Sequence, residues 1–276
     1  MKKRRADEAL YEDLNLPSLE LARALIMEGR VMAGDRKILG ASEPVRPGDV
    51  LRVRGELDAY VSRGAHKLKK ALDVFGIDLT GRVCVDVGAS TGGFTDVMLR
   101  AGASRVYAVD VGYNLLDYRL RSDPRVVCRE RTNARFLSPE DFDPRPSFGA
   151  TDVSFISLKA VLPAALGALA GEDAEFVALV KPQFEAERDE VGEKGVVRSR
   201  AVHEKVLTEI CDFAPGLGWK VKGLDFSPIR GPEGNVEFLL DLVRVENVTT
   251  NGQDYSVNVT IDTAYDFFSI LNDGVL

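Results

Sequence analysis

The spacing of apolar residues indicates a small folded segment at the start of the chain. Apolar residues recur every three or four positions over 6–14 and again over 21–26, which predicts two short helices. Two short strands between 30 and 39 and a third at 50–54 follow, separated by turn-forming glycine, proline and aspartate residues. Two helices and a small sheet are enough for an independent domain. We therefore predict a small α+β domain over residues 1–58.

The pattern changes further along the chain, where apolar runs typical of buried strands alternate with helical periods. The predicted strands lie at 83–85, 106–109, 126–128, 148–151, 176–180, 221–224 and 238–243. Helical periods lie between them, notably at 158–169 and 201–213. This alternation predicts an α/β domain with a mostly parallel, doubly wound sheet over residues 59–245. Residues 246–276 show no clear helical period, and their end could either pack on the domain or hang free.

Composition and charge narrow the class of protein. The 276 residues are 45% apolar and 29% charged, which is typical of a globular protein. The net charge is −7, yet the first 70 residues carry 15 Lys and Arg against 11 Asp and Glu. A basic front suits contact with a polyanion, and an ordinary solvated surface explains the same numbers equally well. If the segment binds RNA, the candidate contacts are Arg4, Arg5, Arg23 and Arg30.

Several other classes of protein are not expected. No apolar run reaches the roughly 18 residues of a membrane span, and the basic start is followed by acidic residues rather than by the apolar core of a signal peptide. Cys84, Cys128 and Cys211 are widely spaced, with only His66 and His203 as companions. That spacing predicts neither a metal site nor a disulfide framework. We expect a cytoplasmic protein, with His66 structural and His203 on a surface helix.

A glycine-rich segment at 86–95 follows the first predicted strand of the α/β domain and opens a helix. Ligands bind at this position in open α/β sheets. Its glycine spacing is G-x-x-x-G-G, which differs from the dinucleotide fingerprint G-x-G-x-x-G. A tight structural turn is the alternative, but a nucleoside cofactor is favoured, with S-adenosylmethionine preferred over NAD by the spacing. The candidate contacts are Asp86, Gly88, Ser90, Thr91, Gly92, Gly93, Phe94 and, at the end of the next strand, Asp110.

Four charged residues are candidates for catalysis. Asp152 and Lys181 directly follow predicted strands, Lys67 precedes the first strand on a helix, and Glu237 precedes the last strand. A lysine with a lowered pKa can remove or orient the proton of a weakly acidic hydroxyl, and a carboxylate can position it. Lys67 could instead be one of three solvated lysines, and Asp152 could cap a turn. Glu237 needs a cation, which either lysine could supply.

Several separated motifs carry a resemblance to a known family. They lie at 86–96, 110–113, 131–133, 152–157, 181–185, 203–206 and 223–229. Together they closely resemble the TlyA-type, or hemolysin-A-type, rRNA 2′-O-methyltransferases, and the resemblance covers roughly residues 5–243. It implies a Rossmann-like, FtsJ-like catalytic domain with a Lys-Asp-Lys-Glu tetrad at Lys67, Asp152, Lys181 and Glu237.

The resemblance also implies how the remaining parts are used. Gly88, Asp110 and Asn133 would line the S-adenosylmethionine site, with Asn133 near the adenine. The N-terminal segment resembles an RNA-binding fold first known from a ribosomal protein of the small subunit. The expected reaction is 2′-O-methylation of rRNA, at cytidine, on free rRNA or ribosomal subunits, with no metal and no stable protein partner. The alternatives are a protein that binds cofactor and RNA without catalysis, or a membrane-lytic hemolysin.

Overall fold

The computed structural model describes residues 4–14, 16, 19–27, 29–46, 48–54, 60–244 and 255–272. The chain divides into two compact units, Met1–Val61 and Ser62–Leu276. Residues 55–59, and with them the predicted boundary after residue 58, lie outside the described residues.

The first unit packs two helices against a three-stranded sheet. Its elements are β1 (Arg4–Arg5), α1 (Ala6–Asp13), α2 (Leu19–Met27), β2 (Val31–Ala33), β3 (Arg36–Lys37), β4 (Pro44–Val45) and β5 (Leu51–Val53). Strands β3, β2 and β5 form an antiparallel sheet in that order, while β1 pairs separately with β4. Leu10, Leu25, Ile26, Val31 and Ile38 are fully buried and form its core. The apolar spacing seen in the sequence therefore marks the residues that face inward.

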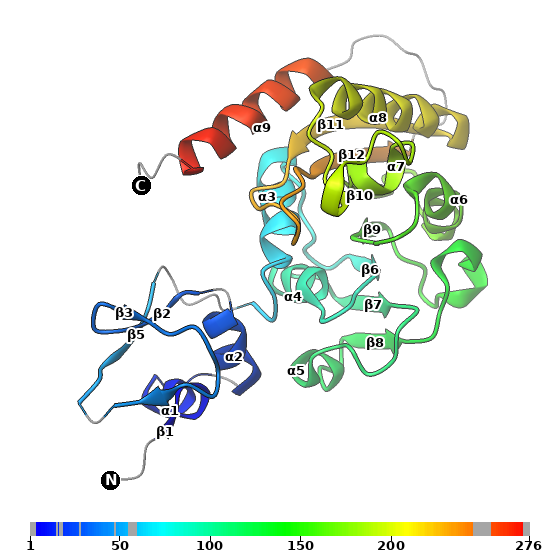
Figure 1. Ribbon diagram of the computed structural model, residues 1–276. Coiled ribbons are helices and arrows are strands. Elements are labelled where there is room, and N and C mark those ends of the chain that lie inside the picture. The colour runs from blue at the N-terminus through cyan, green and yellow to red at the C-terminus, as the bar shows by residue number, and fades with distance from the viewer. Residues whose placement is uncertain are drawn as a thin grey trace. The chain divides into compact units, whose positions relative to one another are not determined.

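The second unit is built on a seven-stranded sheet (Figure 1). Its strands are β6 (Val83–Val87), β7 (Arg105–Val109), β8 (Val126–Arg129), β9 (Phe148–Thr151), β10 (Glu175–Val180), β11 (Trp219–Phe226) and β12 (Phe238–Arg244). The order across the sheet is β11-β12-β10-β9-β6-β7-β8, and β12 runs antiparallel to both of its neighbours. The prediction of a mostly parallel, doubly wound sheet is confirmed.

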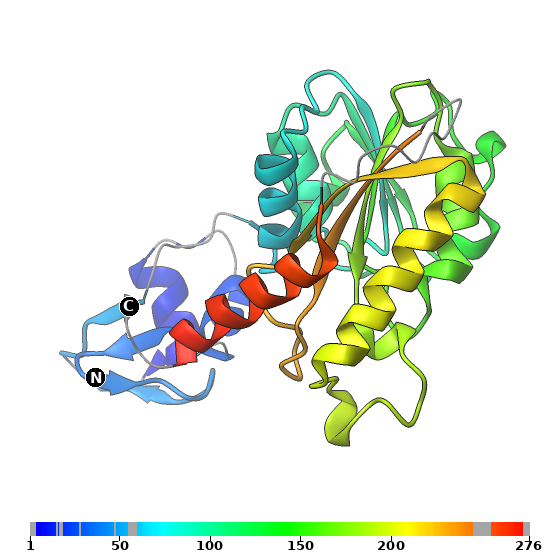
Figure 2. The ribbon, with the colours of Figure 1, turned by 90° about the horizontal axis from the view of Figure 1, so that it is seen from above.

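Helices cover both faces of this sheet (Figure 2). Helices α3 (Ala65–Phe75) and α4 (Gly93–Arg100) lie on one side, and α6 (Leu158–Ala168) and α8 (Arg200–Phe213) on the other. The chain runs outward from β6 to β8 and then returns to β9, so the strand order reverses between β6 and β9. Ligands bind at such a reversal, beyond the carboxyl ends of the strands.

The end of the chain differs from its prediction. Residues Val257–Asn272 form a helix, α9, which packs on β11 and α8. Ile261, Ala264 and Phe268 are buried in the core of the second unit, at positions that share one helix face. The prediction of no clear helical period over 246–276 is therefore wrong for residues 257–272. Intervening asparagine, threonine and aspartate residues, which are weak helix formers, had obscured the period.

This helix also overturns the prediction for His203. His203 is only 1% exposed, and its Nδ1 lies 2.8 Å from the hydroxyl oxygen of Tyr265 on α9. Burial lowers the pKa of His203 to about 4, so the ring is neutral near pH 7. His203 is a core residue rather than a surface one, because α9 covers the face of α8 that carries it.

Candidate active site

Two adjoining hollows lie beyond the carboxyl ends of β6 and β9, within the second unit. One, of about 260 Å³, is lined by the four charged candidates and by the glycine-rich loop. The other, of about 720 Å³, extends past Asp110 and Asn133. Gly88, Ser90 and Asp152 line both hollows, which makes the two spaces neighbours. This arrangement suits a large ligand that lies in the larger hollow and whose reactive end reaches the smaller one.

The four charged candidates form one connected chain of ion pairs. Lys67 Nζ lies 2.7 Å from Glu237 Oε2 and 3.1 Å from Asp152 Oδ2. Lys181 Nζ lies 2.5 Å from the other oxygen of Asp152 and donates a 2.7 Å hydrogen bond to Ser154 Oγ. The order is therefore Glu237, Lys67, Asp152, Lys181. The cation for Glu237, which the sequence left open between two lysines, is Lys67.

Burial strengthens these contacts, and the partner charges decide the charge states of Lys67 and Asp152. Lys67 and Lys181 are each 7% exposed and Glu237 is 1% exposed. Burial by itself would lower the pKa of Lys67, but Asp152 and Glu237 outweigh it, so the pKa is raised. Burial would likewise raise the pKa of Asp152, but Lys67 and Lys181 outweigh it, so the pKa is lowered. Lys67 is thus held as a cation, and it is not one of three solvated lysines.

The topology of the sheet explains why these residues meet. Asp152 directly follows β9 and Lys181 directly follows β10, and these neighbouring parallel strands end at the same edge. Glu237 directly precedes β12, whose antiparallel direction brings its beginning to that edge. Lys67 lies in the first turn of α3, which contacts β10, β11 and β12. Four positions far apart in the sequence therefore converge at one end of the sheet.

The glycine-rich loop approaches its neighbours too closely for larger side chains. Gly88 has φ +85°, and a Cβ there would lie 3.0 Å from Val153 Cγ1 and 3.1 Å from the carbonyl oxygen of Asp152. A Cβ on Gly93 would lie 2.4 Å from Ser62 Oγ. Glycine is needed at both positions for the backbone to run along the wall of the hollow.

Asp110 is held rigidly beside the larger hollow. Its two carboxylate oxygens accept backbone hydrogen bonds from Ser90 (2.8 Å) and Gly112 (2.7 Å). Asn133 lines the same hollow, and its side-chain oxygen accepts a bond from the backbone N–H of Arg135. Each Asp110 oxygen can accept a further bond, and the Asn133 amide can donate one. These are the groups that a ribose diol and an adenine require.

Asp86 has a buried carboxylate oxygen that suits a cationic ligand. Its Oδ2 accepts bonds from the backbone N–H (2.8 Å) and the hydroxyl (2.7 Å) of Thr95. Its Oδ1 is buried without a hydrogen-bond partner, and the residue lines the smaller hollow. Burial raises the pKa of Asp86 to about 7. The ammonium group of the methionine part of S-adenosylmethionine would satisfy this oxygen, so these residues fit that cofactor.

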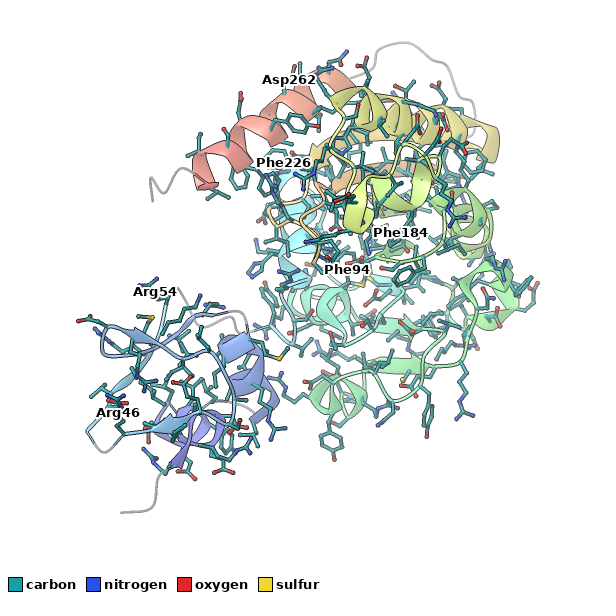
Figure 3. All side chains as sticks on the ribbon, viewed as in Figure 1. Arg46, Arg54, Phe94, Phe184, Phe226 and Asp262 are labelled. Atoms are coloured by element: carbon teal, nitrogen blue, oxygen red, sulfur yellow. The ribbon has the colours of Figure 1, made fainter. Side chains whose placement is uncertain are left out.

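The remaining residues predicted in this loop divide into two groups. Thr91 and Phe94 line the smaller hollow together with Gly93. Gly92 has φ +98°, and a Cβ there would collide with Leu120 at 2.3 Å, so it serves helix packing rather than the hollow. Figure 3 labels Phe94 on α4.

Comparison with known proteins agrees with this geometry. The profile of the FtsJ-like methyltransferases matches residues 60–244. The chain belongs to the FtsJ-like methyltransferase family. It is 44% identical over 240 residues to the 16S/23S rRNA (cytidine-2′-O)-methyltransferase TlyA of Mycobacterium tuberculosis, covering 87% of this chain and 89% of that protein. It is 46% identical to YqxC of Bacillus subtilis, described as a candidate rRNA methyltransferase, covering 87% and 86%.

A solved structure extends this likeness over the whole chain. A candidate hemolysin from Streptococcus thermophilus matches with a TM-score of 0.80 at 43% identity, covering 99% of both chains. The resemblance to the TlyA and hemolysin A proteins is thus confirmed. No helix within the described ranges is long and apolar enough to cross a membrane. In the same part of the chain, no cluster of three metal-binding side chains occurs.

Sequence reasoning gave no role to one further residue of this FtsJ-like site, Phe155. Its side chain is 91% exposed and its φ is +62°, a backbone conformation that is rare for a bulky residue. Its ring lies 5.1 Å from that of Phe184 on α7 (Pro182–Glu185), which Figure 3 labels. Phe155 lines the larger hollow beside Ser154. The motif at 152–157 that contains Phe155 is visible in the sequence, but the exposure of its side chain follows only from the fold.

The arginines predicted to bind RNA are already engaged within the first unit. Arg4 forms ion pairs with Glu12 (3.2 Å) and Asp13 (2.8 Å), both on α1. Two others, Arg5 and Arg23, bind the same buried carboxylate of Asp7. The hydrogen bond from Arg5, assisted by Arg23, holds the pKa of Asp7 well below its usual range.

The fourth predicted arginine, Arg30, is also bonded within the unit. It donates a 3.1 Å hydrogen bond to the carbonyl oxygen of Arg54. The structure therefore gives each of the four predicted arginines a bonding partner within the first unit.

Proposed function

We propose that this protein transfers a methyl group from S-adenosylmethionine to a ribose 2′-hydroxyl of rRNA, with cytidine as the target nucleotide. The observation that carries the proposal is the buried chain from Glu237 through Lys67 and Asp152 to Lys181, set where the two hollows meet. The family and the names of its relatives support the substrate. This function places the protein in the cytoplasm, with rRNA or ribosomal subunits as its partner.

The cofactor would lie along the glycine-rich loop. Asp110 would accept hydrogen bonds from the ribose diol of the cofactor, and Asn133 would lie at the adenine. Asp86 Oδ1 would accept a hydrogen bond from the ammonium group of the cofactor. Once bound, it supplies a methyl group on a positively charged sulfur, which a hydroxyl oxygen can attack. Gly88 and Gly93 leave room for this path because neither carries a side chain.

Lys181 is the proposed base. A neutral amine has two N–H donors and one lone pair. Asp152 and Ser154 would accept the two N–H groups, since both lie within 2.7 Å of Nζ. The lone pair is then left to accept the 2′-hydroxyl proton as the oxygen–methyl bond forms and the sulfur–methyl bond breaks. Lys67, held as a cation, and Glu237, which anchors it, keep Asp152 oriented.

The exposed ring of Phe155 gives the target nucleotide a place to bind. An aromatic side chain beside a hollow is a common stacking surface for an unpaired base. A ribose attached to a base stacked on Phe155 would lie close to Ser154 and Lys181, because Ser154 is the adjacent residue.

The deciding experiment measures transfer of radiolabelled methyl to unmodified ribosomal subunits and free rRNA. The variants are Lys181→Ala, Lys181→Arg and, as a control, Lys159→Ala, an exposed lysine paired with Glu209. We expect 2′-O-methylcytidine from the wild type and the control. Lys181→Arg should be as inactive as Lys181→Ala, because an arginine cannot accept the proton.

If Lys181→Arg retained activity, residue 181 would act as a cation that orients the 2′-hydroxyl and not as a base. Cofactor and RNA binding by the wild type without any methyl transfer would refute the proposed reaction. That result would leave a protein that binds cofactor and RNA without catalysis.

A further inference from the structure

The outer face of the three-stranded sheet in the first unit carries a row of basic side chains. The register places Met32 of β2 opposite both Lys37 of β3 and Arg52 of β5. Arg54 continues the same face, because its backbone N–H bonds to the carbonyl oxygen of Arg30. Side chains alternate along a strand, so the intervening residues point to the opposite, helix-covered face.

The cations on this face differ from Arg4, Arg5 and Arg23 in their partners, since those three arginines bind carboxylates. Lys37, Arg52 and Arg54 are exposed, and within the described residues none of them forms an ion pair with a carboxylate. The side chain of Arg52 donates a 3.3 Å hydrogen bond to the carbonyl oxygen of Gly34. A cation already bound to a carboxylate must lose that partner before it can bind a phosphate. Unpaired cations bind phosphate without that cost.

Arg52 and Arg54 border a hollow of about 270 Å³. It is lined by Met32, Gly34, Asp35, Arg52, Val53 and Arg54. Nothing lies within 4 Å of the place where a Cβ of Gly34 would be, so this part of the face is open. Lys37 lies over Gly29, whose Cβ would be 2.4 Å from Lys37 Nζ, and thus extends along the sheet toward Arg30. Figure 3 labels Arg54.

We propose that this basic sheet face, formed by Lys37, Arg52 and Arg54, is the surface through which the first unit binds the phosphate backbone of structured RNA. The inference rests on the proposed function, which supplies RNA as the partner. Among the residues that the structure describes, Asp35 is the only acidic one lining the hollow, so the face is complementary to a polyanion although the chain has a net charge of −7. The arginine stems and Met32 add an apolar floor that riboses can contact.

The test measures binding of the full chain to unmodified ribosomal subunits as a function of salt. One variant carries Lys37→Gln, Arg52→Gln and Arg54→Gln, and a comparison variant carries Arg4→Gln, Arg5→Gln and Arg23→Gln. Each phosphate contact contributes about 0.7 to 0.9 to the slope of log affinity against log salt. The first variant should therefore lose about two units of slope and bind roughly ten- to hundredfold more weakly near 0.15 M salt.

Further variants separate a loss of contact from a loss of fold. Single Arg52→Gln and Arg54→Gln variants should each lose about one unit of slope, and Arg52→Lys with Arg54→Lys should retain the wild-type slope because the charges remain. Thermal unfolding of every variant checks the fold. An unchanged slope in the first variant, with the loss appearing in the comparison variant instead, would overturn this inference and leave the proposed reaction intact. Absence of rRNA binding by the wild type would defeat both.

Discussion

Lys67 Nζ lies 2.7 Å from Glu237 Oε2, and this buried ion pair joins α3 to the start of β12 in the second unit, the catalytic unit. Glu237 is 1% exposed, and a carboxylate buried to that extent requires a cation. Because Lys67 also contacts Asp152, the pair both holds the fold together and sets the charge beside Lys181. Changing one member of this chain therefore affects the others.

The first prediction concerns Lys67→Ala. Removal of the Lys67 ammonium group leaves Glu237 buried without a cation, so the free energy of unfolding should fall by about 3 to 5 kcal/mol. Methyl transfer should fall at least about a hundredfold because Asp152 loses one of its two cations. Chemical denaturation and the methyl-transfer assay measure the two effects. Lys69→Ala, at an exposed lysine on the same helix, should change stability by less than about 1 kcal/mol.

A double variant separates the two roles of this pair. Lys67→Met with Glu237→Gln removes both charges, so it should recover much of the lost stability without recovering activity. Recovery of activity along with stability would show that Lys67 serves only the fold.

The second prediction is a pH dependence of cofactor binding. The pKa of Asp86 is raised to about 7 by burial, so the carboxyl is mostly protonated at pH 5.5 and mostly ionised at pH 7.5. A cofactor ammonium group binds the ionised form. The affinity for S-adenosylmethionine should therefore increase roughly 25-fold over this interval, as measured by calorimetry. Asp86→Asn should bind weakly at both pH values, and a flat wild-type profile would contradict the assignment.

The third prediction concerns Phe155 as a surface for the target base. Stacking on an aromatic side chain contributes about 1 to 3 kcal/mol per base, so Phe155→Leu should raise the KM for rRNA about five- to hundredfold. Phe155→Tyr should restore it, because the aromatic face returns. Tyr118→Leu, at another exposed ring, is the control. Cofactor affinity is measured in parallel since Phe155 also lines the larger hollow. Equal KM values for leucine and phenylalanine at this position would exclude stacking.

The fourth prediction tests whether α9 is an integral part of the catalytic unit. Phe268 is 4% exposed, and the guanidinium of Arg230 lies 4.7 Å from its ring centroid. Phe268→Ala should lower the free energy of unfolding by about 3 to 5 kcal/mol. Ile270→Ala, two residues further on and 53% exposed, should lower it by less than about 1 kcal/mol. Similar small effects at both positions would mean that the helix is not docked in solution.

Part of this site could be predicted from the sequence because strand ends are visible there. Asp152 and Lys181 follow apolar runs, and parallel strands bring such positions to one edge. The pairing within the tetrad could not be predicted. Either lysine could have served Glu237, and Lys67 reads as solvated beside two other lysines, because burial depends on how α3 packs against the sheet. The RNA-binding cations of the first unit could not be chosen from the sequence for the same reason. The sequence shows which residues are basic, but not which of them face a carboxylate.

The sequence by itself determined most of the helices and strands up to β12, the mostly parallel sheet and the position of the cofactor loop, but not helix α9. These follow from the period of apolar residues and the spacing of glycines, which are local properties of the chain. Tertiary structure alone decided the burial of His203 under α9, the exposure of Phe155 and the ion pair between Lys67 and Glu237. Each of these depends on contacts between segments far apart in the chain. Solvent exposure and charge pairing are set by those contacts, so no local pattern can specify them.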